Sequence, residues 1–333
     1  MGTKHVWMAI SALAIAGCSQ NEITENGQDT HPAIGFDVYT GVTTKGVETT
    51  TASMKTDGFG VLAIKASDTE TYMTERKVTN AGSAWTYPTP AYWPANGDNL
   101  TFYSYAPHSK ATLTNTSGTV TLADYTINGT FANMVDLVAA TATPTTAGTN
   151  VDIEMKHILS RVALAAYTAR DLATTGITVE VTDVSIIGST ANAGSKFYEK
   201  GTYTYSGTSA ASGSWGSTAA LAADYAVING GNIGVTASTS AAADDLLGGA
   251  YLYCIPAATF TDGDIQIKIK YKTTVNAVAT VKEETVKVPV GGSWAMGTAY
   301  KYTFKIAMNA IIFDNVTVDN TWADGSSTDL VTR

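Results

Sequence analysis

The stretch "IQIKIKYK", residues 265–272, alternates large apolar side chains with lysine and glutamine. Ile265, Ile267, Ile269 and Tyr271 form one face, and the polar residues form the other. A period of two is typical of a β-strand with one face in a core and one in water. The segment therefore predicts a sheet that is covered on one side only, as antiparallel sheets commonly are.

Similar composition extends over most of the chain. Thr, Val, Tyr and Ile dominate the regular runs, and Gly, Asn, Asp and Ser separate them. Short strands with almost no helices between them favour an all-β fold of antiparallel β-sandwiches over a parallel α/β sheet. Further strands are expected at 59–63, 100–105, 162–167, 286–290 and 300–308.

Three local features carry more specific expectations. In "ITVEVTDVSIIG", residues 177–188, the apolar phase shifts by one residue, which predicts a β-bulge near Asp183. The segment 203–217 is rich in Gly and Ser and is expected to be a long loop. The best candidate for a short helix is the alanine-rich stretch from Ala219 to Tyr225.

The length of 333 residues suggests two domains, at about 150 residues per domain. The stretch "ATPTTAGTN", residues 142–150, is polar and turn-rich between two apolar segments. It is the expected boundary. The N-terminal sandwich then covers 19–150 and the C-terminal sandwich covers 151–333.

Residues 1–18 have the pattern of a signal peptide. Lys4 and His5 precede an apolar run that ends at Ala16 and is shorter than the about 20 residues of a membrane span. The tetrapeptide Ile15-Ala16-Gly17-Cys18 resembles the bacterial lipobox, which would make Cys18 the lipidated residue. The alternative is a buried N-terminal strand with an incidental cysteine. Cys254, within "AYLYCIPAA", is expected to be a small core residue.

The chain is acidic, with 29 Asp and Glu against 20 Lys and Arg, a formal net charge of −9. Nucleic-acid binding is therefore disfavoured, because phosphate recognition needs a basic face. A hydrophobic content of 44% is ample for a core.

No motif for catalysis or metal binding is found. His31, His108 and His157 are widely separated and lack zinc-ligand spacing, so no metal and no cofactor are expected. His157 alternates with apolar residues and is predicted to be structural. An enzyme is not expected, although two carboxylates of a glycosidase could escape a sequence search. The aromatic residues Trp85, Tyr87, Tyr92 and Trp93 form either a sugar site or part of a core.

Several motifs follow one another along the chain. They are the lipobox, "AIGFDVYTGVTTKG" (33–46), "AYWPANGDNLTFYSYAP" (91–107), "MVDLVAATAT" (134–143), "VDIEMKHILSRVAL" (151–164), "YLYCIPAA" (251–258), "GGSWAMGTAYKYTFKI" (291–306) and "IIFDNVTVDNTW" (311–322). In this order they resemble the fimbrillin-like lipoproteins of Bacteroidales, the subunits of the type V pilus. The resemblance runs from Met1 to about Trp322.

The resemblance implies two tandem transthyretin-like β-sandwiches and a mechanism of assembly. Subunits of this family reach the outer membrane as lipoproteins, and a trypsin-like protease then removes the first strand. A strand from a neighbouring pilin subunit, the same or related, fills the open groove. The product is a cell-surface pilus used for adhesion.

Several residues meet the demands of that mechanism. Ile34, Phe36, Val38 and Val42 alternate, so the first strand, within 33–45, can fill a groove with one apolar face. Lys45 follows in a Gly- and Thr-rich segment that a protease can reach. The family usually has arginine at this point, so the lysine is a departure that does not suit an arginine-specific protease. Arg76 is a secondary candidate. The alternative is a permanent edge strand followed by an ordinary loop lysine.

The candidate donor strand is 310–322. Ile311 and Phe313 share one face, and after a phase change Val316 and Val318 share another. The last residues, "ADGSSTDLVTR", fill a groove poorly, so either 310–322 is the donor or the subunit caps the fibre. A stalk subunit is favoured over a tip subunit. The alternative functions are a surface glycan-binding lipoprotein of an outer-membrane uptake system and a β-sandwich glycosidase.

Overall fold

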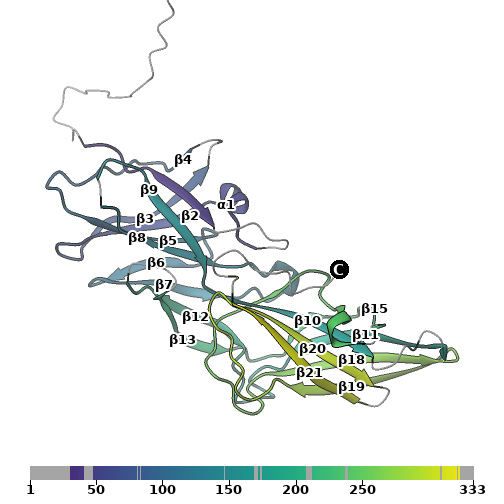
Figure 1. The fold of residues 1–333 in the computed structure, drawn as a ribbon. Helices are drawn as coiled ribbons and strands as arrows, with labels where there is room; N and C mark the ends of the chain where they lie inside the picture. The colour runs from purple at the N-terminus through teal and green to yellow at the C-terminus, as the bar shows by residue number, and fades with distance from the viewer. Residues whose placement is uncertain are drawn as a thin grey trace, which may run out of the picture.

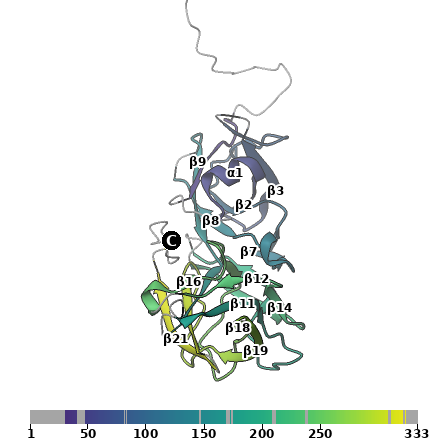
Figure 2. The same cartoon turned by 90° about the vertical axis from the view of Figure 1, so that its right-hand side faces the viewer.

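The computed structural model describes residues 31–40, 48–80, 82, 84–145, 147–168, 172, 175–207, 212–236, 239–307, 310–320 and 322. Within them the chain is almost entirely β, so the predicted all-β class is confirmed. Figure 1 and Figure 2 show an elongated molecule with the N-terminal strands at one end and the C-terminal strands at the other. No helix in the described part is long and apolar enough to span a bilayer.

The N-terminal sheet contains seven strands. Its order is β1 (Phe36–Thr40), β9 (Val151–His157), β8 (Val138–Ala142), β5 (Leu100–Ala106), β2 (Phe59–Lys65), β3 (Thr71–Asn80) and β4 (Trp85–Thr86). β1 lies at one edge and pairs with β9 in the parallel sense, whereas the other neighbours are antiparallel.

One α-helix, α1 (Thr51–Asp57), lies between β1 and β2 in the chain. Thr50 and Ser53 form a capping box, in which each side chain accepts from the backbone N–H of the other residue. Gly58 ends the helix at φ +77°, where a Cβ atom would lie 2.6 Å from the Val78 carbonyl oxygen. The helix therefore stops where the chain must turn into β2.

A four-stranded sheet joins the two ends of the molecule. Its order is β13 (Ser214–Ala220), β12 (Tyr198–Thr204), β7 (Thr119–Thr126) and β6 (Thr112–Thr116). β7 and β12 pair across residues far apart in the sequence. The Tyr205 hydroxyl, just past β12, donates to the Ser104 carbonyl at 2.7 Å. The two ends of the molecule are therefore connected by backbone pairing and not by a flexible linker.

Two further sheets form the C-terminal sandwich. The first has the order β16 (Asp244–Asp245), β10 (Ser160–Thr168), β20 (Ala299–Ala307) and β21 (Ala310–Asp319), and β17 (Leu252–Cys254) also pairs with β10. The second has the order β14 (Tyr225–Ile228), β11 (Ile177–Ile186), β18 (Gln266–Val275) and β19 (Val278–Lys287), and β15 (Ile233–Gly234) pairs with β11. Short 3₁₀ turns lie at Phe131–Asn133 and Ser240–Ala242.

Several local predictions are confirmed. Ile267, Ile269 and Tyr271 of β18 are buried, and the lysines between them are partly exposed. The bulge expected near Asp183 is present, because the register of β11 against β18 shifts between Val181 and Asp183. Cys254 is buried, as expected of a core residue.

Other predictions need correction. The segment 203–217, expected as a loop, contains the end of β12 and the start of β13. Ala219 to Tyr225, expected as a helix, spans the end of β13 and the start of β14, because cross-strand pairing there outweighs the helix propensity of alanine. Strand pairing also carries the N-terminal sheet to His157, past the boundary expected at residue 150. The division at that residue stays a prediction.

Candidate functional site

The first strand is held in place by its inward side chains and by two segments of backbone. Ile34, Phe36 and Val38 are buried, whereas Asp37 and Tyr39 point outward. β1 pairs with β9 along its length, with Phe36 opposite Val151. Just before β1, the Ile34 N–H donates to the Ala91 carbonyl at 2.8 Å. We call the surface that these inward side chains cover the first-strand groove.

Aromatic rings form the wall of the first-strand groove around Phe36. The Phe36 ring centroid lies 5.9 Å from that of Phe59, 5.7 Å from that of Tyr87 and 5.9 Å from that of Phe102. The Tyr87 hydroxyl donates to the Ile34 carbonyl at 2.8 Å. Phe36 is therefore the central side chain of the strand.

The aromatic cluster noted in the sequence belongs to this wall. Trp93 is buried with its ring 5.9 Å from Phe102, and Trp85 packs on Phe59 at 5.3 Å. Tyr92 is the member that is mainly exposed. The interpretation of these residues as core is favoured over a sugar-binding platform, which would present its ring faces to solvent.

Other predicted site residues lie outside the described part of the chain. These are Cys18, Val42 and Lys45. Arg76, the secondary candidate for cleavage, is described and lies within β3, opposite Val61. A residue in the middle of a paired strand is a poor protease site, because cleavage would need local unfolding.

The candidate donor segment forms β21, an edge strand whose one partner among the described strands is β20. Ile311 and Phe313 are partly buried, and the Phe313 ring lies 5.5 Å from Tyr302 and 5.6 Å from Phe304. Val316 and Val318 are 40% and 47% exposed. The predicted phase change coincides with a bulge, because Phe304 pairs with Phe313 while Thr303 pairs with Asn315.

A buried polar cluster lies between the two ends of the molecule and was not predicted. We define it as Glu48, Asp136, His157, Arg161 and Trp322. Glu48 and Arg161 form an ion pair with both side chains about 1% exposed. His157 Nδ1 lies 2.6 Å from Asp136 Oδ2, so His157 is a structural residue with a partner, as expected.

The indole of Trp322 covers this cluster. Its ring stacks on His157 with centroids 4.2 Å apart and planes 20° apart. The Arg161 guanidinium lies over the Trp322 ring at 5.1 Å and over Tyr251 at 4.4 Å. One feature of the sequence could have indicated this cluster, because His157 and Arg161 lie close together in a single motif. Their partners are distant along the chain, so the cluster itself could not be predicted.

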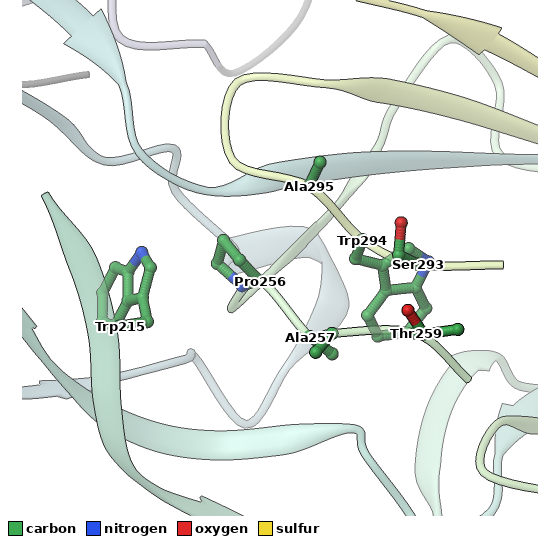
Figure 3. A pocket seen from close by; sticks show the side chains of 8 residues that line it. Trp215, Pro256, Ala257, Thr259, Ser293, Trp294 and Ala295 are labelled. Atoms are coloured by element: carbon green, nitrogen blue, oxygen red, sulfur yellow. The ribbon is translucent and has the colours of Figure 1, made fainter. Parts of the chain in front are cut away.

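A shallow pocket of about 400 Å³ lies between β13 and the loops near Pro256 and Ser293. Figure 3 shows Pro256 between Trp215 and Trp294 in this view. Both indole N–H groups are used inside the fold, since Trp215 donates to the Ile158 carbonyl at 2.6 Å and Trp294 to the Tyr302 hydroxyl at 2.8 Å. None of the described residues that line the pocket is ionisable, so acid–base catalysis has no group to act there.

Among the described residues no group of three His, Cys, Asp or Glu side chains could hold a metal ion. Burial raises the pKa of the Cys254 thiol, which keeps it protonated and unreactive.

The sequence profile of the fimbrillin-like family matches residues 44–322. The chain belongs to this family. This fimbrillin-like chain is 28% identical to the fimbrium subunit Fim1C of Phocaeicola vulgatus, with 99% of each chain covered. Its fold is similar to that of a fimbrial protein from Bacteroides vulgatus, at a TM-score of 0.66 and 22% identity, with 86% of this chain and 98% of that chain covered. The names of these relatives describe fimbrial proteins and not enzymes.

Proposed function

We propose that this fimbrillin-like protein is a structural subunit of a surface pilus used for adhesion, and that it polymerises by strand exchange. Cys18 carries a lipid that anchors the exported precursor to the outer membrane. A trypsin-like protease cuts after Lys45 and releases the first strand, and a donor strand within 310–322 of another subunit takes its place. The side chains of the donor strand that would face the groove are Ile311, Phe313, Val316 and Val318. The subunit belongs to the stalk of the pilus.

The observation that carries this proposal is the position of β1 at an edge of its sheet, where it and the residue Ile34 just before it bury three side chains. Because β9 is its ladder partner, the strand can leave without breaking another pair of strands. Burying Ile34, Phe36 and Val38 is worth about 1.5–3 kcal/mol each before the entropy of ordering the strand. Loss of β1 therefore leaves an apolar groove with unpaired backbone, which a second strand can fill.

A contact in which the donor strand and the groove lie on different surfaces does not close on itself. Head-to-tail contacts of this kind produce filaments. β1 stays in place until proteolysis and covers the apolar edge during export. This cover limits premature association.

Limited trypsin digestion tests the proposal. The soluble chain 19–333, which lacks Cys18, is clipped gently, and the cut is located by intact mass. Association is then followed on an unheated SDS gel. Lys45→Gln is the variant that should resist the cut, and Arg76→Gln is the matched control that should not change it.

The three outcomes differ clearly. Loss of the segment up to Lys45 followed by an SDS-resistant ladder supports the stalk subunit. Clean loss of the segment without a ladder supports a tip or accessory subunit and overturns the stalk assignment. A chain that is not cut at Lys45 and stays monomeric would overturn the strand-exchange mechanism.

A further inference from the structure

Of the strands that the structure describes, the last, β21, resembles the first, β1 with its preceding residues, in sequence. Residues 33–37 read "AIGFD" and residues 310–314 read "AIIFD", identical at four of five positions. Both segments lie at the edges of sheets, as β1 with its preceding residues and as β21. The side chains at the shared Ile and Phe positions are the inward ones in each case, with Ile34 and Phe36 buried and Ile311 and Phe313 partly buried.

The two segments differ by one inserted residue after the shared Asp. Val38 follows Asp37 directly, whereas Asn315 separates Asp314 from Val316. The bulge in β21 lies at this same place, between the pairs Phe304–Phe313 and Thr303–Asn315. A bulge moves the next inward position by one residue, so Val316 corresponds to Val38.

We propose that β21 of one copy occupies the first-strand groove of a second copy in the register of β1. Ile311, Phe313 and Val316 then take the positions of Ile34, Phe36 and Val38. The inserted strand runs parallel to β9, because its side chains follow one another in the same order as those of β1. The proposal rests on the proposed function and adds the partner, a second copy of this chain, because groove and matching strand belong to one sequence.

The two segments differ at one position, Gly35 against Ile312. A Cβ atom at Gly35 would clash with the amide of Asn150, which donates to Asp37 Oδ2 at 3.0 Å. The equivalent residue of the incoming strand is Ile312. The Asn150 side chain must therefore rotate away in the assembled form, and a glycine at 312 would remove the conflict.

Cysteine pairs test the register. Asp37 lies opposite Asp152 across the β1–β9 ladder, and both side chains are exposed. A chain with Cys18→Ser, Asp152→Cys and Asp314→Cys is clipped with trypsin and mildly oxidised, then boiled and run without reductant. The register predicts a covalent ladder. Asp37→Cys with Asp152→Cys in the uncut chain shows whether this position can form a disulfide, and Thr317→Cys with Asp152→Cys is the out-of-register control.

The result separates the two proposals. A ladder on the unheated gel that disappears on boiling, with the Asp37 pair oxidised normally, would overturn the register and leave strand exchange standing. A covalent ladder from the Thr317 pair instead of the Asp314 pair would also overturn it. A clipped chain that forms neither ladder counts against the proposed function itself.

Most of β21 is only loosely covered by the rest of its own subunit. Ile312 is 52% exposed, and Val316 and Val318 are also exposed. Trp322, just beyond the strand, is 1% exposed and lies against His157, Arg161 and Tyr253. Its indole N–H has no hydrogen-bond partner among the described residues, so the contacts described for this side chain are those of its ring.

We further infer that Trp322 is the anchor of β21 and that Glu48 helps to position it. Glu48 pairs with Arg161, and Arg161 lies over the Trp322 ring. Thr49, the next residue, donates from its backbone N–H to Asp136 Oδ2 at 3.2 Å and from its hydroxyl to the Asp136 carbonyl at 2.7 Å. The segment that follows Lys45 in the sequence and the end of the candidate donor strand therefore meet in one buried cluster.

Hydrogen exchange on the uncut chain tests the anchor without any need for assembly. Trp322→Ala should speed exchange of β21 amides by about tenfold or more and leave β2 unchanged, because the lost stacking is local. Trp322→Phe should restore most of the protection. Trp85→Ala, which removes an indole packed on Phe59 of β2, is the matched control and should affect β2 instead of β21.

Measured relative to β2, Glu48→Gln should speed β21 exchange by less than Trp322→Ala does, since it acts on the strand only through Arg161. Equal acceleration of β2 and β21 in Trp322→Ala would show that the indole is an ordinary core residue, and unchanged β21 exchange would show that something else holds the strand. Either result would overturn the role of Trp322 as the residue that anchors β21.

Discussion

Replacing Phe36 with alanine should destabilise the uncut precursor strongly and the cut chain not at all. Phe36 is 2% exposed and its ring contacts three other aromatic rings. Truncation of a buried phenylalanine to alanine costs about 3–5 kcal/mol from lost burial and the cavity that remains. We expect the upper part of that range, because each aromatic pair adds about 0.5–1.5 kcal/mol beyond its buried area.

Urea unfolding of the precursor, followed by tryptophan fluorescence, measures this cost. The midpoint should fall while the denaturant slope stays the same, which reports a change in stability and not in the exposed surface. Tyr39→Ala is the matched control, because Tyr39 lies in the same strand but points outward and is 45% exposed. Its cost should stay within about 0.5–1 kcal/mol.

After trypsin removes the first strand, Phe36→Ala, Tyr39→Ala and the unchanged chain become the same molecule and should unfold alike. A cost below about 1 kcal/mol for Phe36→Ala in the precursor would refute the reasoning that Phe36 is the central side chain of the first-strand groove. Equal costs for Phe36→Ala and Tyr39→Ala would refute the assignment of inward and outward faces.

Three further predictions follow from other parts of the molecule. Glu48→Gln removes the carboxylate that pairs with the buried Arg161 guanidinium and should lower the free energy of unfolding by about 3–5 kcal/mol in urea titrations. An unchanged midpoint would contradict a stabilising ion pair. A hydrogen bond from Lys268 holds the pKa of Asp224 below its ordinary value of 3.8. The ionised Asp224 therefore stabilises the folded chain above pH 3.8, and this contribution is lost as pH falls through the lower pKa of the folded state. Asp224→Asn should therefore cost less than about 1 kcal/mol at pH 7, because the pair is about a third exposed, and should reduce the acid sensitivity measured by urea titrations below pH 4. Ile312→Gly should speed ladder formation after the trypsin cut, and no change in rate would mean that Asn150 does not hinder the incoming strand.

Much of the fold could be predicted because its signals are local. The alternation in β18 and the phase shift at Asp183 depend only on neighbouring residues, and the structure contains both. The inward positions of Ile34, Phe36 and Val38 could be predicted for the same reason. The period of two describes which side chains share a face, whatever the partner strand is.

Features that depend on distant pairing could not be predicted. β1 pairs with β9, and β10 with β20, in the parallel sense, although only antiparallel sheets were expected. β1 alternates buried and exposed residues, as strands of antiparallel sheets commonly do, so its pattern does not indicate the parallel pairing. The buried polar cluster brings together Glu48, Asp136 and Trp322, and none of them has a sequence neighbour that points to the others.

The direct passage of β9 into β10 has a mechanical consequence. These strands span residues 151–157 and 160–168, one in the N-terminal sheet and the other in the C-terminal sandwich. In a fibre of the proposed kind, tension enters through the strand inserted beside β9 and leaves through β20, which lies beside β10 and precedes the donated β21 in the chain. The load then runs along the strand axes, so the ladder hydrogen bonds are sheared together instead of opened one after another. A thin filament of such subunits would resist the drag of flowing liquid without a covalent link between neighbours.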